Sequence, residues 1–491
     1  MARRLLVPPL SDLSLAPDLA PGDELLDLNA AFVDRLTGDA HLRGLAAGYA
    51  TGGHDADDDP AEAATKTLFV RAAGAVLARG RHDAGRLRAV GVALRLSGED
   101  DPALRLAGDD VELVGGTTEA GTDVLSAAAR TTLWEPETDR ARDWARGHRV
   151  HLLIETDQQL PAAARFIEAV GPERTVLCGR FAADHAPALR ALGPFANAAD
   201  IEDWAPAWRL RPEWAADGEP VHWVRRAATW RAGVPWAGWL EPEEAALLPE
   251  EAWSDCRGLA LTVARLESWA RVTGTHGTPV GLEHVLKLAG PGRLAVELLV
   301  GAPGVGAEET TATARRLVTG PGPRLAGFSA FRLPAARGRT VPDTWGGLPL
   351  TRTAVGHHDL PRWDPFDAPG TLGRSERTAL IGALTGESGT DTDLFPGRFA
   401  GSAAAVPGPE SLWEPSAAVV HEEGRGPDGR GPGPFVVNLR SGGAFRLHPR
   451  LAPVVERLAS GDTTVLDRLG ETVRTKLSGQ LVRAGVIRRH R

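Results

Sequence analysis

Three neighbouring residues, His357, His358 and Asp359, carry side chains that could bind a metal ion or exchange protons. Imidazole changes charge near neutral pH and is a common metal ligand, and the adjacent carboxylate would add a second base. Consecutive residues on a strand point to opposite faces, so the three groups would not converge if this segment is extended. Two interpretations therefore stand, a catalytic or metal site and a surface loop.

Glycine-rich turns after apolar runs are a second kind of candidate. Gly301-Ala302-Pro303-Gly304 lies between the apolar run 294–300 and a helical pattern, where backbone amides could bind an anion. Gly179 follows the apolar run 175–178 in a similar way. Turns of this kind are also common connectors. The sequence has no Walker loop, no Gly-x-Gly-x-x-Gly after a strand and no His-Glu-x-x-His.

The chain has only two cysteines in 491 residues, Cys178 and Cys256. They can form one disulfide at most and cannot supply the thiolates of a structural zinc site or an iron–sulfur cluster. Cys178 ends an apolar run and is typical of a buried thiol. Cys256 precedes an arginine but has no visible histidine partner, which argues against a nucleophile.

Composition places the chain among soluble globular proteins, with 43% hydrophobic and 24% charged residues. No apolar run approaches the roughly 20 residues of a membrane span, and the N-terminus lacks a signal-peptide pattern, so we expect a cytoplasmic protein without membrane contacts. The net charge of −9 argues against general nucleic-acid binding. Residues 424–491 nevertheless contain 13 Lys/Arg and 5 Asp/Glu, a net charge of +8, which favours contact with a polyanion, with an acidic peptide or with the acidic remainder of the chain.

Apolar patterning predicts the elements that must position these groups. Expected strands cover 90–96, 111–114, 150–154, 175–179, 294–300 and 325–333, with a hairpin at 435–439 and 444–448. Expected helices cover 22–36, 61–79, 161–170, 185–192, 308–318, 375–386, 451–459 and 463–484. Residues 204–269 hold nine of the 14 tryptophans, which indicates either an aromatic core or a cavity for a flat ligand.

Alternation of strands and helices predicts an α/β protein. We expect a Rossmann-like domain of the cobalamin-binding type at 1–203 and a partial TIM-type barrel at 204–345. A Pro/Gly-rich connecting region at 346–434 and a small winged-helix-like module at 435–491 would follow.

The order of these segments resembles the cobalamin-binding radical SAM enzymes that modify ribosomally made peptides. The resemblance rests on Pro8-Pro9, on Asp27-Leu28-Asn29-Ala30-Ala31-Phe32 and on Leu177-Cys178-Gly179-Arg180, where the family usually has a Gly-Gly turn. It continues through the 301–304 turn and Phe328-Ser329-Ala330-Phe331-Arg332-Leu333-Pro334. It implies that cobalamin or S-adenosylmethionine is a possible cofactor and that Gly179, Gly301, Pro303 and Gly304 contribute to cofactor binding.

The resemblance breaks at the iron–sulfur cluster. Trp230-Arg231-Ala232-Gly233-Val234-Pro235-Trp236 stands where the family has Arg-Gly-Cys-Pro-Trp. The three cluster cysteines would then fall on Val234, Gly238 and Glu241, none of which is a thiolate. Because reductive cleavage of S-adenosylmethionine needs a cluster iron, we expect no iron–sulfur cluster and no radical chemistry.

The terminal module resembles the small winged-helix elements that bind leader peptides by adding a strand to a sheet edge. The resemblance implies peptide contacts at Phe435, Val437, Leu439, Arg446 and Arg450. A module that only caps the barrel is the alternative.

Three hypotheses follow. The first is a cluster-free radical SAM-like protein in peptide natural-product maturation, which binds the precursor peptide or a catalytic partner protein. The second is a cluster-free enzyme on the same scaffold, which uses cobalamin or S-adenosylmethionine for methyl transfer, or metal or acid–base chemistry at His357, His358 and Asp359. The third is a barrel protein of small-molecule metabolism.

Overall fold

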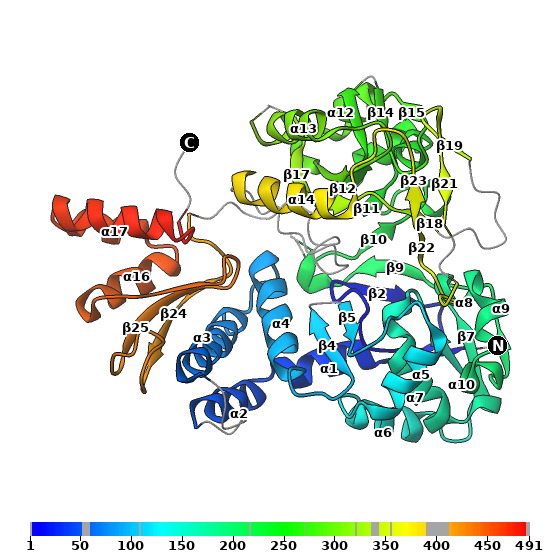
Figure 1. Ribbon diagram of the computed structural model, residues 1–491, viewed down its shortest axis with the longest axis horizontal. Helices are drawn as coiled ribbons and strands as arrows, with labels where there is room; N and C mark the ends of the chain where they lie inside the picture. The colour runs from blue at the N-terminus through cyan, green and yellow to red at the C-terminus, as the bar shows by residue number, and fades with distance from the viewer. Residues whose placement is uncertain are drawn as a thin grey trace. The chain divides into compact units, whose positions relative to one another are not determined.

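The computed structural model describes residues 2–51, 59–107, 110–215, 218–269, 271–319, 322–334, 343–353, 356–388 and 412–487. The chain forms two compact units, each built from two segments (Figure 1). Unit 1 consists of Met1–Asn29 and Glu112–Pro407, and unit 2 of Ala30–Val111 and Gly408–Arg491. Of the helices in the described ranges, none has the length and apolar character that a membrane span requires.

The first sheet of unit 1 has five parallel strands in the order β3-β1-β6-β7-β8. They are β1 (Arg4–Val7), β3 (Glu24–Asp27), β6 (Val150–Leu153), β7 (Thr175–Cys178) and β8 (Asp200–Ile201). The strands predicted at 150–154 and 175–179 are thus confirmed, and their apolar side chains are buried as expected for a covered parallel sheet. The five parallel strands confirm the prediction of an α/β fold with a Rossmann-like parallel sheet.

Helices of unit 1 precede β6 or connect the strands β6, β7 and β8 of this sheet. They are α5 (Gly121–Arg130), α6 (Glu135–Trp144), α7 (Leu160–Val170), α8 (Arg180–Asp184), α9 (Ala186–Leu189) and α10 (Gly193–Ala196). α7 confirms the helix predicted at 161–170 and buries Phe166, Ile167 and Val170. The helix expected at 185–192 is present only as the short α9.

The second sheet of unit 1 has seven strands in the order β17-β16-β12-β11-β10-β9-β2. They are β2 (Leu15–Asp18), β9 (Ala207–Leu210), β10 (Val221–Val224), β11 (Trp236–Leu240), β12 (Cys256–Val263), β16 (Leu294–Val300) and β17 (Arg324–Ala330). The five strands from β10 to β17 run parallel, whereas β9 and β2 pair antiparallel at one edge. The sheet is open, and Trp236, Leu261 and Val296 belong to its buried core.

Helices and short hairpins complete unit 1. The helices are α11 (Pro242–Ala246), α12 (Glu283–Ala289), α13 (Ala307–Thr319) and α14 (Arg374–Ser388). α13 and α14 confirm the helices predicted at 308–318 and 375–386. The short strands are β13 (Arg265–Ser268), β14 (Arg271–Thr273), β15 (Pro279–Val280), β18 (Leu333–Pro334), β19 (Thr344–Trp345), β20 (Leu348–Pro349), β21 (Thr351–Arg352), β22 (Trp363–Asp364) and β23 (Phe366–Asp367).

Unit 2 has a three-stranded antiparallel sheet between two apolar clusters. Its strands are β24 (Ala417–Glu422), β25 (Gly433–Asn438) and β26 (Gly443–Arg446), with β25 in the centre. One face packs against α2 (Asp39–Ala50), α3 (Pro60–Leu77) and α4 (Ala84–Ser97). The other face packs against α16 (Ala452–Ala459), the 3-10 segment Thr463–Arg468 and α17 (Glu471–Arg483), as Figure 1 shows. The predicted hairpin and the helix predicted at 61–79 are confirmed.

Four expectations differ from the structure. The strand predicted at 90–96 is part of α4, which Asp83 caps by accepting hydrogen bonds from the backbone N–H groups of Gly85 and Arg86. The helix predicted at 22–36 begins only at Leu28, because 24–27 forms β3 and pairs with β1. The helix predicted at 463–484 is interrupted at Gly470. Residues 30–111, expected in the Rossmann-like domain, lie in unit 2 with the terminal module.

Candidate functional site

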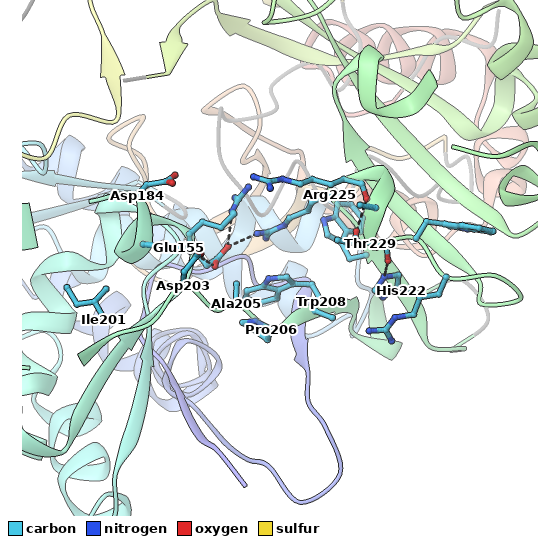
Figure 2. A pocket seen from close by; sticks show the side chains of 18 of the residues that line it. Glu155, Asp184, Ile201, Asp203, Ala205, Pro206, Trp208, His222, Arg225 and Thr229 are labelled. Atoms are coloured by element: carbon cyan, nitrogen blue, oxygen red, sulfur yellow. Dashed lines mark hydrogen bonds and ion pairs between the residues drawn. The ribbon is translucent and has the colours of Figure 1, made fainter. Parts of the chain in front are cut away.

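A cleft of about 790 Å³ lies in unit 1 beside the carboxyl ends of three parallel strands of the first sheet and of β10 in the second sheet (Figure 2). Glu155 follows β6, Arg180 follows β7, Asp203 follows β8, and Arg225 follows β10. Ligands of open α/β sheets bind at the carboxyl ends of their strands, where loops from several strands meet. This edge is therefore where chemistry or binding is expected in unit 1.

Glu155 is the centre of a charge network in the cleft. Its carboxylate, which is 7% exposed, accepts hydrogen bonds from Arg225 Nη1 at 2.7 Å and from the Arg180 backbone N–H at 3.2 Å. Arg180 Nε lies 3.4 Å away. Burial disfavours the charged form, but Arg225 and Arg180 outweigh it and lower the pKa of Glu155. The carboxyl is thus an anion held between two cations.

Arg225 links this network to an aromatic surface. Its guanidinium lies 5.0 Å from the centre of the Trp208 ring, a distance typical of a cation–π contact. Burial and the nearby Arg180 lower the pKa of Arg225, while Glu155 and Asp12 oppose the change. Because a guanidinium starts from a very high pKa, Arg225 stays charged at neutral pH.

The remaining lining combines flat apolar surfaces with exposed cations and with the carboxylates of Asp184 and Asp203. Trp208, Trp223 and Trp230 come from β9, β10 and the loop after β10. Arg226 and Arg231 are exposed on that loop, and Arg231 Nη1 lies 3.2 Å from Asp18 Oδ2. Such a lining suits a flat ligand that carries anionic or amide groups.

The tryptophan-rich region supports both interpretations of its sequence. Five of its nine tryptophans are less than 9% exposed and pack in the interior, namely Trp208, Trp214, Trp223, Trp236 and Trp253. Two of these five also line the cleft. Trp208 and Trp223 therefore belong both to the buried core and to the wall of the cleft.

His222 is the histidine of the cleft. Its Nε2 lies 2.8 Å from the Thr229 carbonyl oxygen, so this nitrogen carries the proton (Figure 2). Burial lowers the pKa of His222, which keeps the ring neutral at neutral pH. It positions the loop after β10 and does not add a charge to the cleft.

Of the predicted cofactor residues, one lies beside the cleft. Gly179 precedes Arg180 and has a φ of 99°, and a Cβ atom there would lie 2.5 Å from the Ile154 carbonyl oxygen. Only glycine fits this turn. Gly301, Pro303 and Gly304 lie after β16, and Arg377 packs over Gly301 and Leu348 over Gly304, away from the cleft lining.

His357, His358 and Asp359 lie on a segment that contacts the loop before α5. His358 Nδ1 lies 2.9 Å from Glu119 Oε2, and Asp359 Oδ1 accepts a hydrogen bond from the Gly121 N–H at 2.7 Å. These contacts fasten the segment to α5. Among the described residues, no group of three or more His, Cys, Asp or Glu side chains is arranged to hold a metal ion.

The three positions predicted to align with cluster cysteines lie in β11 or within two residues of it. Val234 precedes the strand, Gly238 lies within it, and Glu241 follows it. A Cβ atom on Gly238 would lie 2.4 Å from the Val224 carbonyl oxygen, so even a small side chain would not fit there. Cys178 and Cys256 are buried in β7 and at the start of β12, and burial raises the pKa of Cys256 to about 12. These residues do not fit an iron–sulfur cluster.

The predicted peptide-binding residues fall into two groups in unit 2. Phe435, Val437 and Leu439 are buried and pack on the α3 side of the sheet. Arg446 lies on β26 and Arg450 is exposed after it. Side chains of the first group are covered by protein, so any peptide contact here depends on β26.

Comparison with known proteins gives one weak likeness. No family model matches the chain, and no curated protein matches it. Among solved structures, it is similar to the radical S-adenosylmethionine methyltransferase TsrM from Kitasatospora setae, with cobalamin and a [4Fe-4S] cluster bound. The sequences are 13% identical, the match covers 78% of this chain and 91% of that chain, and the TM-score is 0.22. A superposition this loose does not establish a common fold.

Sequence reasoning did not identify Glu155 and Arg225 as site residues. They are 70 positions apart, and in a chain rich in arginine one more arginine carries little information. The available signal was their position, because each directly follows an apolar run that forms a parallel strand.

Proposed function

We propose that this protein is a cluster-free scaffold in the maturation of a ribosomally made peptide, and that it binds the precursor peptide along β26. The open edge of β26 carries the proposal. Among the described strands, β26 pairs only with β25. An unpaired edge strand presents backbone donors and acceptors to which an extended peptide can add.

The register identifies which residues present these groups. The Leu447 N–H donates to the Pro434 carbonyl oxygen, and the pairing continues as Val436 with Phe445 and Val437 with Ala444. In an antiparallel ladder, every second residue directs its backbone groups to the partner strand. Ala444 and Arg446 therefore direct theirs outward, where a peptide strand would lie.

Charge favours an acidic peptide at this edge. Arg446 and Arg450 lie on and just after β26, and Arg474 and Lys476 are exposed on α17. Arg446 already pairs with Asp428 at 2.7 Å and Arg474 with Asp467 at 3.6 Å, so these two contribute less than Arg450 and Lys476. An extended segment with alternating acidic and β-branched residues matches both the backbone edge and the charge.

Fluorescence anisotropy with two labelled peptides tests this proposal. One peptide alternates Glu and Val, and its control alternates Lys and Val. We expect the acidic peptide to bind and the basic one not to bind. Ala444→Pro removes the outward N–H at a position where proline is tolerated, and should weaken binding at least tenfold. Ala444→Val keeps the N–H and should bind like the native protein. Equal binding of both peptides, or of both variants, would overturn the proposal.

The cleft supports a second candidate function, the binding of cobalamin or S-adenosylmethionine without radical chemistry. Its support is the combination of Trp208 and Trp230 with exposed Arg226 at the carboxyl edge of the strands. Bound there, either group would supply methyl-transfer chemistry, while the chain's own residues would bind and orient it.

Titration with hydroxocobalamin and with S-adenosylmethionine tests the second function. Arg226→Glu reverses an exposed charge in the cleft and should weaken binding at least tenfold. Arg209→Glu, on β9 and outside the cleft lining, is the matched control. If neither compound binds, the second function is excluded and only the peptide-binding function stands.

A further inference from the structure

Two glutamates that follow β11 approach the same turn, residues 274–278, which connects β14 and β15. Glu241 directly follows the strand, and Glu243 lies in the first turn of α11. A Cβ atom on Gly274 would lie 2.4 Å from Glu241 Oε2 and 3.2 Å from Glu243 Oε2. Both carboxyl groups therefore approach the same backbone position, which only a glycine leaves open.

The two carboxyl groups differ in their hydrogen bonds. Glu241 accepts from the Thr275 N–H at 2.9 Å and from the Thr275 hydroxyl at 2.8 Å. The Thr275 carbonyl oxygen in turn accepts from Trp345 Nε1 at 3.1 Å. Both oxygens of Glu243 are buried and have no hydrogen-bond partner among the described residues. The turn at 274–278 is thus fastened to one member of a carboxyl pair.

A polar layer lies nearby in the same sheet. Thr262 on β12 accepts from Trp239 Nε1 at 2.9 Å and donates to Glu297 Oε2 at 3.1 Å. The Ser329 hydroxyl donates to the other oxygen of Glu297. Four adjacent parallel strands, β11, β12, β16 and β17, therefore contribute one polar side chain each.

The carboxyl pair has no compensating cation among the described residues. Burial raises the pKa of Glu241 to about 7; hydrogen bonds from Thr275 oppose the rise, and Glu243 and Glu297 add to it. The charged groups of the neighbouring elements have other partners or face solvent: Glu244 of α11, Arg265 and Glu267 of β13, Arg271 of β14 and His276 of the turn.

We propose that Glu241 and Glu243 form a proton-controlled latch for the turn at 274–278. When Glu241 is protonated, the pair carries less negative charge, and Glu241 holds Thr275 through its two hydrogen bonds. When this proton leaves, the two neighbouring carboxylates repel each other, and no cation of the described residues stabilises them. The turn then separates from α11, and water reaches the polar layer of Trp239, Thr262 and Glu297. This switch goes beyond the proposed function and does not depend on it.

Hydrogen–deuterium exchange of the full-length protein tests the latch. The peptide that contains the Thr275 amide is followed from pH 6 to 8.5 and corrected for the intrinsic pH dependence of exchange. We expect its protection to fall at least tenfold, with a midpoint near pH 7. Constant protection over this range would overturn the proposal.

Variants identify the groups that titrate. Glu241→Gln keeps the hydrogen-bond acceptor and cannot ionise, so protection should become independent of pH. Glu243→Gln removes the adjacent charge and should move the midpoint to lower pH, which provides a readout even if the first variant does not fold. Glu267→Gln, exposed on β13, should behave like the native protein. A midpoint that persists in Glu241→Gln, or stays fixed in Glu243→Gln, would contradict the latch.

Discussion

Glu155 and Glu241 occupy equivalent positions and have opposite properties. Each follows a parallel strand of unit 1, and each is largely removed from water. Arg225 and Arg180 lower the pKa of Glu155 despite its burial. Burial raises the pKa of Glu241, which accepts hydrogen bonds from Thr275 but has no cation beside it in the part of the chain that the structure describes. The comparison shows that the guanidiniums, and not the place in the fold, determine the charge of a buried carboxyl at these strand ends.

Arg225→Leu should cause the largest loss of unfolding free energy in unit 1. It leaves Glu155 buried without its closest cation, and breaking a buried ion pair costs about 3–5 kcal/mol. We expect about 3 kcal/mol, the lower end, because the Arg225 side chain is 23% exposed. Urea unfolding followed by tryptophan fluorescence reports on unit 1, where 13 of the 14 tryptophans lie. Arg226→Leu is the control, and a similar loss in both variants would contradict the account.

The pH dependence of stability should differ in sign at the two carboxyls. The folded pKa of Glu241 lies above its unfolded value of 4.5, so the folded state binds more protons and stability falls as pH rises from 4.5 to about 7. Glu241→Gln removes this penalty and should gain about 3 kcal/mol over the native protein across that interval. The folded pKa of Glu155 is lowered, so its contribution is present above pH 4.5 and is lost in more acidic solution. Urea unfolding at pH 3, 4.5, 6 and 8 measures both; a gain that does not grow with pH between 4.5 and 8 would refute the assignment at Glu241.

Much of the fold could be predicted from sequence where apolar runs decide the structure. Residues 150–154 and 294–300 are apolar except for His151 and Glu297, and both segments form buried parallel strands. Residues 90–96 are equally apolar but form a helix, because α4 is buried on most of its circumference and has no polar face to show its period. The strand 24–27 depends on pairing with β1, a contact that its local pattern does not contain.

Less of the candidate site could be predicted. Gly179 was identified from a turn pattern that is local in sequence, and it does lie beside the cleft. Glu155 and Arg225 meet only because β6 and β10 end at the same place, which single-sequence patterns do not show. Glu241 was singled out for its alignment with a cysteine, whereas its contacts with Thr275 and Gly274 depend on a turn more than 30 residues away.

Gly274→Ala tests whether Glu241 contacts the turn at 274–278. The added methyl group would lie 2.4 Å from Glu241 Oε2, so the turn or the carboxyl has to move. Overpacking of this kind costs about 1–3 kcal/mol, which we expect as lost unfolding free energy of unit 1. Gly292→Ala, with no neighbouring atom within 4 Å of the new methyl group, is the control. Equal stability of the two variants would show that Glu241 and the turn are not in contact.

Arg180→Ala should have the smallest effect. Its side chain is 51% exposed, and exposed ion pairs contribute about 0–1 kcal/mol. We expect a loss in this range, because Arg225 still holds Glu155. A loss as large as that of Arg225→Leu, measured by the same urea unfolding, would mean that Arg180 rather than Arg225 sets the charge of Glu155.

Our central proposal is that this chain serves peptide maturation as a binding scaffold and carries out no radical chemistry. Anaerobic reconstitution of the full-length protein with iron and sulfide, followed by reduction and addition of S-adenosylmethionine, tests it most directly. We predict no 5′-deoxyadenosine, because Val234, Gly238 and Glu241 provide no thiolate and both cysteines are buried in strands. Formation of 5′-deoxyadenosine by the reconstituted protein would contradict the account.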